Sequence, residues 1–142
     1  MSEQENVQVV REAYATFGRG DIQTLLNMYA DDVEFIIPGP PDVIPYAGTR
    51  RGRDQVARFY PALNEAIEFE QFEPREFIAQ GDKVVVLGQG RGRVRSTGQS
   101  FEDEWVHVVT LRGGKVTGFR VYEDTAAMVT AFTASQRAGR AT

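Results

Sequence analysis

The chain has 142 residues, of which 42% are hydrophobic and 25% charged, and its formal net charge is −4. This length and composition are typical of one soluble domain with a buried core, so we expect a single domain over 1–142 with its core at about 5–134. The sequence contains no cysteine, which excludes disulfides, thiol catalysis and thiolate metal sites. Its acidic balance argues against nucleic acid as a partner.

The sequence also indicates where in the cell the protein is found. No apolar run is long enough to cross a bilayer, and the acidic start of the chain at 1–5 does not resemble a secretory signal. We therefore expect a cytoplasmic protein with no membrane partner. Arginines gather at two places: Arg50, Arg51 and Arg53, and then Arg91, Arg93 and Arg95. The second group has period two, so its side chains share one face of a strand, and we favour a solvated sheet face over an anion or nucleic-acid site.

The first half of the chain predicts three helices and one strand. Apolar residues at helical spacing mark helices at about 5–17, 22–29 and 56–67, and Asp21 is placed to cap the second of them. Apolar alternation predicts a strand over 33–37. The proline- and glycine-rich stretch at 38–53 predicts a long loop, and such loops often form the mouth or lid of a site.

The second half predicts four antiparallel strands from Phe69 onward, with hairpin turns at 97–98 and 113–114. A short helix capped by Asp124 or Thr125 then runs through Phe132, and we expect a flexible tail over 135–142. Helices segregated to one side of an antiparallel sheet define an α+β fold. We expect the sheet to curve around a cavity, with the glycines at 88, 90 and 92 helping the curvature.

The chain's single histidine, His107, is the first candidate for chemistry. Strand alternation places it on one face with Trp105 and Val109, where burial would lower the pKa of the imidazole. Such a residue can act as a general base or a hydrogen-bond donor, or it can be a core histidine, and the sequence leaves these interpretations open.

The register of the last hairpin decides which residues face His107. A two-residue turn at 113–114 pairs His107 with Arg120, whereas a three-residue connection pairs it with Phe119. We prefer the second register because it collects Phe119 and Val121 on one apolar face. Glu123 then lies further along that face as a candidate partner of His107.

Other polar residues offer weaker signals. Tyr14 lies on the inner face of the first predicted helix and could serve as an oxyanion donor or as a core residue. Asp31 and Asp32 stand where a helix gives way to a strand, which favours capping and turn roles. With one histidine and no ligand-spaced cluster, we expect neither a metal nor a cofactor.

Three segments resemble a known family: 20–22, 29–33 and 114–124 are similar to the SnoaL-like, ketosteroid-isomerase-related branch of the nuclear transport factor 2-like superfamily. The resemblance covers roughly residues 7–132. It implies a cone-shaped α+β roll, in which a curved antiparallel sheet wraps around three helices and encloses one pocket. It also implies a homodimer packed through the outer face of the sheet.

The resemblance argues against two known mechanisms. Tyr14 matches the oxyanion tyrosine of ketosteroid isomerase, but the proton-moving aspartate of that enzyme falls on Ile37 and its protonated aspartate on His107. The aspartate–arginine–aspartate set of limonene epoxide hydrolase falls on Gly88, Gly90 and Val121. In SnoaL-type cyclases the acid/base aspartate is nearest to Asp124, whose predicted face points away from the pocket.

We therefore expect a small-molecule pocket protein, with His107, Glu123 and Tyr14 as catalytic residues. The reaction would be an isomerisation, cyclisation or hydration of a hydrophobic carbonyl or polyketide-like compound. The alternatives are a non-catalytic binding module for an apolar ligand and a dimerisation scaffold with a vestigial pocket. The remaining predicted pocket residues are Phe17, Phe35, Ile37, Tyr46, Phe59, Trp105, Val109, Phe119 and Val121.

Overall fold

The computed structural model describes the backbone of residues 2–141 and the side chains of residues 2–134. The first half has two helices, two strands and two further helices, and long strands dominate the second half. In chain order they are α1 (Glu3–Gly18), α2 (Ile22–Asn27), β1 (Tyr29–Ile37), β2 (Gly48–Arg51), α3 (Gly52–Ala57), α4 (Phe59–Ala66), β3 (Ile67–Gln80), β4 (Lys83–Val94), β5 (Ser100–Arg112), β6 (Lys115–Tyr122) and α5 (Thr125–Ala141).

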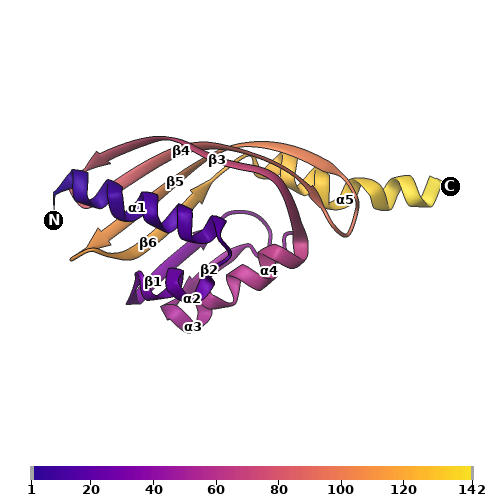
Figure 1. Ribbon diagram of the computed structural model, residues 1–142. Helices are drawn as coiled ribbons and strands as arrows, with labels where there is room; N and C mark the ends of the chain where they lie inside the picture. The colour runs from indigo at the N-terminus through magenta and orange to yellow at the C-terminus, as the bar shows by residue number, and fades with distance from the viewer. Residues whose placement is uncertain (1, 142) are drawn as a thin grey trace.

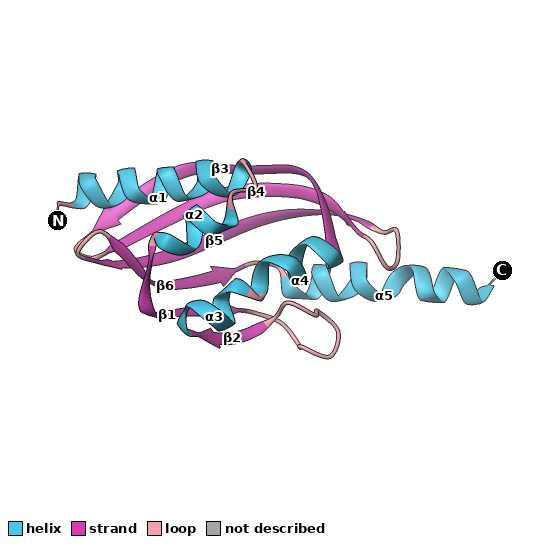
Figure 2. Ribbon diagram, turned by 60° about the horizontal axis from the view of Figure 1, so that its bottom comes forward, coloured by secondary structure: helices cyan, strands magenta, loops and turns pink. Residues whose placement is uncertain are grey.

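The strands form one six-stranded sheet in the order β2-β1-β6-β5-β4-β3. Neighbouring strands are antiparallel except β1 and β6, which are parallel. Helices α1 to α4 lie on one side of this curved sheet, and α5 projects beyond its end (Figures 1 and 2). The predicted α+β architecture is confirmed.

Several element boundaries differ from the predictions. The third predicted helix is divided into α3 and α4 at Arg58, because Pro61 has no N–H to offer the carbonyl of Ala57 one turn earlier. The predicted loop at 38–53 contains the short edge strand β2. Helix α5 continues to Ala141 instead of ending near Phe132. The flexibility proposed for 135–142 stays a prediction.

The β5–β6 hairpin adopts neither predicted register. Arg112 pairs with Lys115 across a two-residue glycine turn, and both turn glycines have positive φ, +56° and +82°. A bulge one step further then shifts the register, so that His107 faces Val121. Relative to the preferred register, which paired His107 with Phe119, the turn and the bulge together shift the pairing by two residues. Because side chains alternate with period two, residues 119, 121 and 123 stay on the predicted face.

The glycines of β4 make room for other groups rather than only allowing curvature. A Cβ added to Gly88 would lie 2.2 Å from Cζ2 of Trp105, so the indole occupies the space that a side chain would need. A Cβ on Gly92 would lie 2.5 Å from the carbonyl oxygen of Glu68. The opposite strand β3 carries two irregularities, at 69–71 and 74–76, where its register against β4 shifts.

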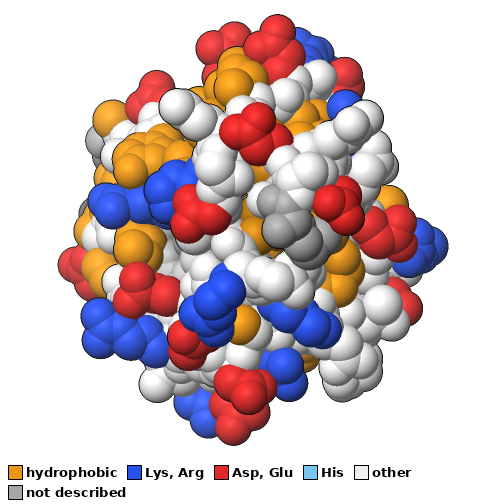
Figure 3. Space-filling model, turned by 90° about the vertical axis from the view of Figure 1, so that its left-hand side faces the viewer, with side chains coloured by type: hydrophobic (Ala, Val, Ile, Leu, Met, Phe, Trp, Pro, Cys, Tyr) orange, Lys and Arg blue, Asp and Glu red, His pale blue; other side chains and the backbone are white. Residues whose placement is uncertain are grey.

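Charged residues lie at the surface in pairs. Arg93 and Arg95 both reach the carboxylate of Glu68, at 2.7 and 3.6 Å, and Arg91 on the same face is exposed. Basic and acidic side chains are interspersed on the face that Figure 3 shows. Within residues 2–141 no helix is long and apolar enough to span a membrane. The cytoplasmic location stays a prediction.

Candidate active site

A cavity of about 130 Å³ lies between the helices and the inner face of the sheet. One water needs about 10–15 Å³ by the same measure, so the space suits a molecule of roughly ten non-hydrogen atoms. The lining is mostly apolar and aromatic. It includes every predicted pocket residue: Tyr14, Phe17, Phe35, Ile37, Tyr46, Phe59, Trp105, His107, Val109, Phe119, Val121 and Glu123. Their roles in binding and catalysis stay predictions.

Stacked rings form one wall of the cavity. Trp105 lies parallel to Phe72, with centroids 4.9 Å apart and planes at 13°. Trp105 also stacks on His107, with ring centroids 4.0 Å apart and planes at 20°. Flat rings held in this way present a flat surface, which favours planar ligands. Phe72 was not among the predicted pocket residues.

His107 is bonded to Tyr14, not to Glu123. The Tyr14 hydroxyl lies 2.7 Å from Nδ1 of the imidazole. Burial lowers the pKa of His107 to about 3, so the ring is neutral at pH 7. Burial also raises the pKa of the Tyr14 hydroxyl, which keeps its proton. The pair is therefore uncharged, and one of its two protons is free to point toward a ligand.

Glu123 lies instead against Asp103, a residue that the sequence analysis did not select. Burial raises the pKa of Glu123 to about 9, and the hydrogen bond and charge of Asp103 add to this effect. Burial also raises the pKa of Asp103, while the hydrogen bond to Glu123 opposes the rise. Two carboxyl groups in one apolar site cannot both ionise at low cost, so at neutral pH the pair holds one proton.

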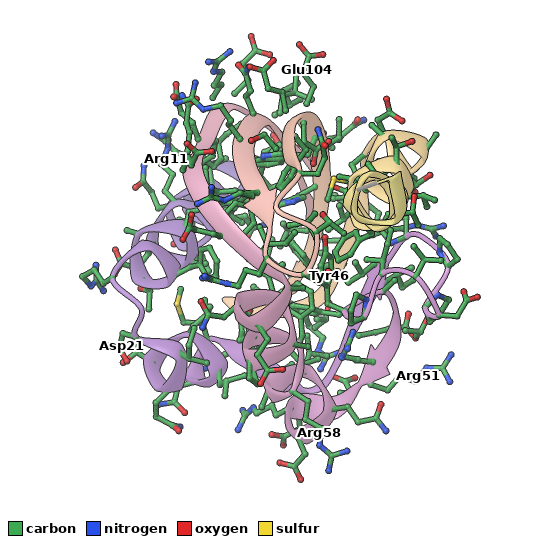
Figure 4. All side chains as sticks on the ribbon, turned by 90° about the vertical axis from the view of Figure 1, so that its right-hand side faces the viewer. Arg11, Asp21, Tyr46, Arg51, Arg58 and Glu104 are labelled. Carbon is green, nitrogen blue, oxygen red and sulfur yellow. The ribbon has the colours of Figure 1, made fainter. Side chains whose placement is uncertain are left out.

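Tyr46 closes the cavity near this carboxyl pair. Burial raises the pKa of its hydroxyl, and the charges of Glu123 and Asp103 raise it further. Its side chain lies in the interior, whereas Arg51 and Arg58 point outward at the periphery (Figure 4). The loop at 38–47 therefore contributes directly to the site, as its apolar residues indicated.

Two buried polar atoms of the cavity have no hydrogen-bond partner among the described residues. They are Oδ1 of Asp103 and Nε1 of Trp105. Both residues are strongly buried, with exposed fractions of 8% and 3%. Buried polar groups in folded proteins are normally paired, so these two atoms mark a position where a ligand or water belongs.

The signal for Asp103 was present in the sequence. The alternation that placed Trp105 and His107 on the inner face also places residue 103 there, two positions earlier on the same strand. The sequence analysis named the inward residues of this strand only from Trp105 onward. A charged residue at an inward position is uncommon, so Asp103 is itself a signal for a functional site.

The other acidic candidates have structural roles. Asp124 is exposed and caps α5, because its side chain accepts a hydrogen bond from the N–H of Ala127 at 3.0 Å. Asp31 and Asp32 form surface ion pairs with Arg53 and Arg112, at 3.1 and 3.0 Å, and do not act as caps. Among residues 2–134 no group of three metal-ligating side chains gathers.

The shifted pKa values of Glu123 and His107 predict how stability depends on pH. Between pH 4.5 and 9 the folded chain holds a proton on Glu123 that the unfolded chain has lost, so stability falls as pH rises through this range. Between pH 6.5 and 3 the unfolded chain binds a proton at His107 that the folded chain refuses, so stability falls as pH drops. We expect Glu123→Gln to flatten the decline above pH 6.5 in urea unfolding; parallel slopes for the two proteins would contradict this.

An α+β cone whose helices enclose an aromatic cavity defines the class of nuclear transport factor 2-like proteins. Residues 10–119 match the SnoaL-like domain, and the chain belongs to this family. An NTF2-like protein from Burkholderia xenovorans LB400 is 47% identical, with a TM-score of 0.85 over 93% of this chain and 98% of that one.

Two further relatives extend the comparison. TerC, solved after co-crystallisation with polyporic acid, is 29% identical, with a TM-score of 0.80 over 90% of this chain and 98% of that one. An uncharacterised protein of Mycobacterium tuberculosis is 28% identical over 89% of this chain and 95% of its own length. These proteins cover almost the whole domain, so the likeness is not confined to one segment.

Proposed function

We propose that the protein binds a planar, hydrophobic carbonyl compound in this cavity and moves a proton on it, as an isomerase or cyclase does. The observation that carries the proposal is the Asp103–Glu123 pair. An apolar cavity that needed only to bind would be better served by apolar side chains, because burying ionisable groups costs free energy. Perturbed carboxyl groups in a cavity are typical of acid/base sites.

The pair supplies both a base and an acid. Asp103 as the carboxylate takes a proton from the carbon next to the carbonyl; the electron pair of the broken C–H bond forms a C=C bond, and the π pair of the carbonyl moves to its oxygen. Where the substrate has a C=C bond one carbon further along, the product is a conjugated dienolate, and return of the proton from the carboxyl pair to its far carbon gives the isomer. Burial raises the pKa of both carboxyl groups, that of Glu123 to about 9, and a carboxylate with a raised pKa is a stronger base.

Tyr14 and His107 would hold the oxygen on which negative charge develops. If Tyr14 donates to Nδ1, the Nε2–H of His107 is the free donor, and with the other tautomer it is the Tyr14 hydroxyl. A neutral imidazole with a pKa of about 3 is a weak base, so we assign His107 the donor role and the proton-moving role to the carboxyl pair.

The relative TerC supports a small-molecule ligand, since it was crystallised with polyporic acid. At about 10–15 Å³ for each water-sized atom, the cavity of about 130 Å³ suits a ligand of roughly nine to thirteen non-hydrogen atoms.

Deuterium exchange tests the proposal. We expect the protein to accelerate exchange of the protons next to the carbonyl of 2-tetralone in D₂O, followed by NMR at neutral pH. Native mass spectrometry of the purified protein would show in parallel whether a compound is retained. Binding of 2-tetralone without accelerated exchange would reject the enzyme for this substrate class and favour the alternative, a binding module.

We also propose that two copies pack through the outer sheet face. Apolar side chains occupy this face on adjacent strands, and helices α1 to α4 cover only the opposite one. Tyr122 and Ile78 are 48% and 53% exposed. Exposed apolar side chains on one face are typical of a protein interface. The half-buried members of the patch are Val85, Leu87, Val106 and Val108.

Val106→Glu tests this dimer, because Val106 pairs with both Leu87 and Tyr122 at the centre of the patch. We expect the wild type to elute as a dimer and the variant as a folded monomer in size exclusion with light scattering. Thr49→Glu, on the exposed edge strand β2 outside the patch, should remain a dimer. A monomeric wild type would contradict the proposal.

A further inference from the structure

We propose that the substrate carries a hydroxyl group as well as its carbonyl, and that this hydroxyl lies between Nε1 of Trp105 and Oδ1 of Asp103. The inference rests on the proposed function only in placing the substrate in this cavity. Its independent basis is that these two atoms are the buried side-chain polar atoms of the described residues that have no partner.

The strand register brings the two groups together. Nε1 of Trp105 lies over Gly90, 3.6 Å from the position that a Cβ would take there. Gly90 is the register partner of Asp103 on the adjacent strand. The indole N–H and the Asp103 carboxyl group therefore lie over the same residue pair, at the same part of the cavity wall.

The chemistry of these atoms selects a hydroxyl. An indole N–H can only donate a hydrogen bond, and a carboxylate oxygen can only accept one. A ketone or ether oxygen satisfies the indole and leaves the carboxylate oxygen unpaired, which is costly in a buried site. A hydroxyl group accepts from the indole and donates to the carboxylate at once, so it satisfies both atoms.

The surrounding rings narrow the class further. Phe72 and Trp105 are nearly parallel, and the cavity has room for a bicyclic molecule. Phenols and enols on a planar bicyclic ring fit this description. A water molecule has the same donor and acceptor capacity as a hydroxyl, so water is the natural occupant of the position before the ligand displaces it.

Three ligands with the same bicyclic ring test the inference: 2-naphthol, 2-methoxynaphthalene and naphthalene. The methoxy compound keeps the acceptor oxygen and lacks the donor. In calorimetric titrations we expect 2-naphthol to bind roughly tenfold or more tightly than 2-methoxynaphthalene, since a hydrogen bond to a charged group is strong. Equal affinity for these two would overturn the inference and leave the cavity's proposed function standing. Failure of all three to bind would overturn both.

Variants assign the preference to the two atoms. Asp103→Leu removes the acceptor, and Trp105→Phe removes the N–H while keeping a ring in the stack. We expect 2-naphthol to lose its advantage over naphthalene by roughly tenfold in each variant. Naphthalene affinity within about threefold of wild type would show that the cavity is intact. A full 2-naphthol preference in Asp103→Leu would overturn the assignment.

Discussion

Asp103→Asn should lower the rate of deuterium exchange into 2-tetralone by about 10²–10⁴-fold, the usual contribution of a positioned general base. Asparagine keeps the size of the side chain and one acceptor oxygen, but it replaces the other oxygen with an NH2 donor and cannot take a proton. Because the substitution also removes a buried charge, the variant should be at least as stable as the wild type. The loss should therefore appear in the rate and not in the unfolding midpoint.

Neighbouring acids provide the controls. Asp124 is exposed and caps α5, and asparagine is an equally good cap, so Asp124→Asn should leave both rate and stability unchanged. Glu123→Gln should impair exchange and also change its pH profile, because it removes the partner that shares the proton. Normal exchange by Asp103→Asn would reject Asp103 as the base, and loss of exchange in Asp124→Asn would assign that role to the position that the SnoaL-type cyclases suggest.

His107→Phe, tested in the same deuterium-exchange assay, shows whether His107 acts as a hydrogen-bond donor or as the base. A donor to a developing oxyanion contributes through charge stabilisation, so its loss should lower the rate without shifting the pH at which the rate rises. A shifted pH profile would instead assign proton transfer to the imidazole. The outcome decides between the two roles that the sequence left open for this residue.

The inner face of the sheet was predictable because it depends on alternation alone. The inward-facing residues stay the same when the register between β5 and β6 shifts by an even number of residues, as it does here by two. They are residues 105, 107, 109, 119 and 121. The partners of polar groups depend on the exact register. The bulge at Thr117 stands next to Gly118, and a glycine inside a strand often marks a bulge, but that signal does not fix the register. The observed register, continued beyond Tyr122, brings Glu123 level with Trp105, which is two residues from Asp103 on the same face.

The contacts of His107 illustrate the same limit, whereas the division of α3 from α4 does not. Tyr14 was expected to aim into the cavity, but its 2.7 Å contact with His107 depends on how α1 packs over β5, which no local pattern encodes. The helix break could have been inferred from Pro61, whereas strand β2 could not, because its four residues carry no alternating pattern. Sequence patterns thus identified the wall of the cavity better than the polar pair within it.

Gly88→Ala should destabilise the protein, because Trp105 occupies the space that the new methyl group needs. The new Cβ would lie 2.2 to 2.6 Å from three atoms of the Trp105 ring, far inside van der Waals contact. Overpacking of this kind typically costs about 1–3 kcal/mol, so we expect the thermal midpoint to fall by roughly 4–12 °C. Because the indole must move toward the cavity, binding of naphthalene should weaken as well.

Gly90→Ala is the matched control, two residues along the same strand and on the same face. Its Cβ would meet its nearest neighbours at 3.5 and 3.6 Å, which is ordinary contact, so the midpoint should stay within about 2 °C of wild type. Trp105 is the only tryptophan of the chain, so its fluorescence reports the indole's environment directly. We expect an altered emission maximum for Gly88→Ala. Equal stability and equal emission for the two variants would show that Gly88 does not hold the indole in place, and the geometry from which we infer the hydroxyl position would fail with it.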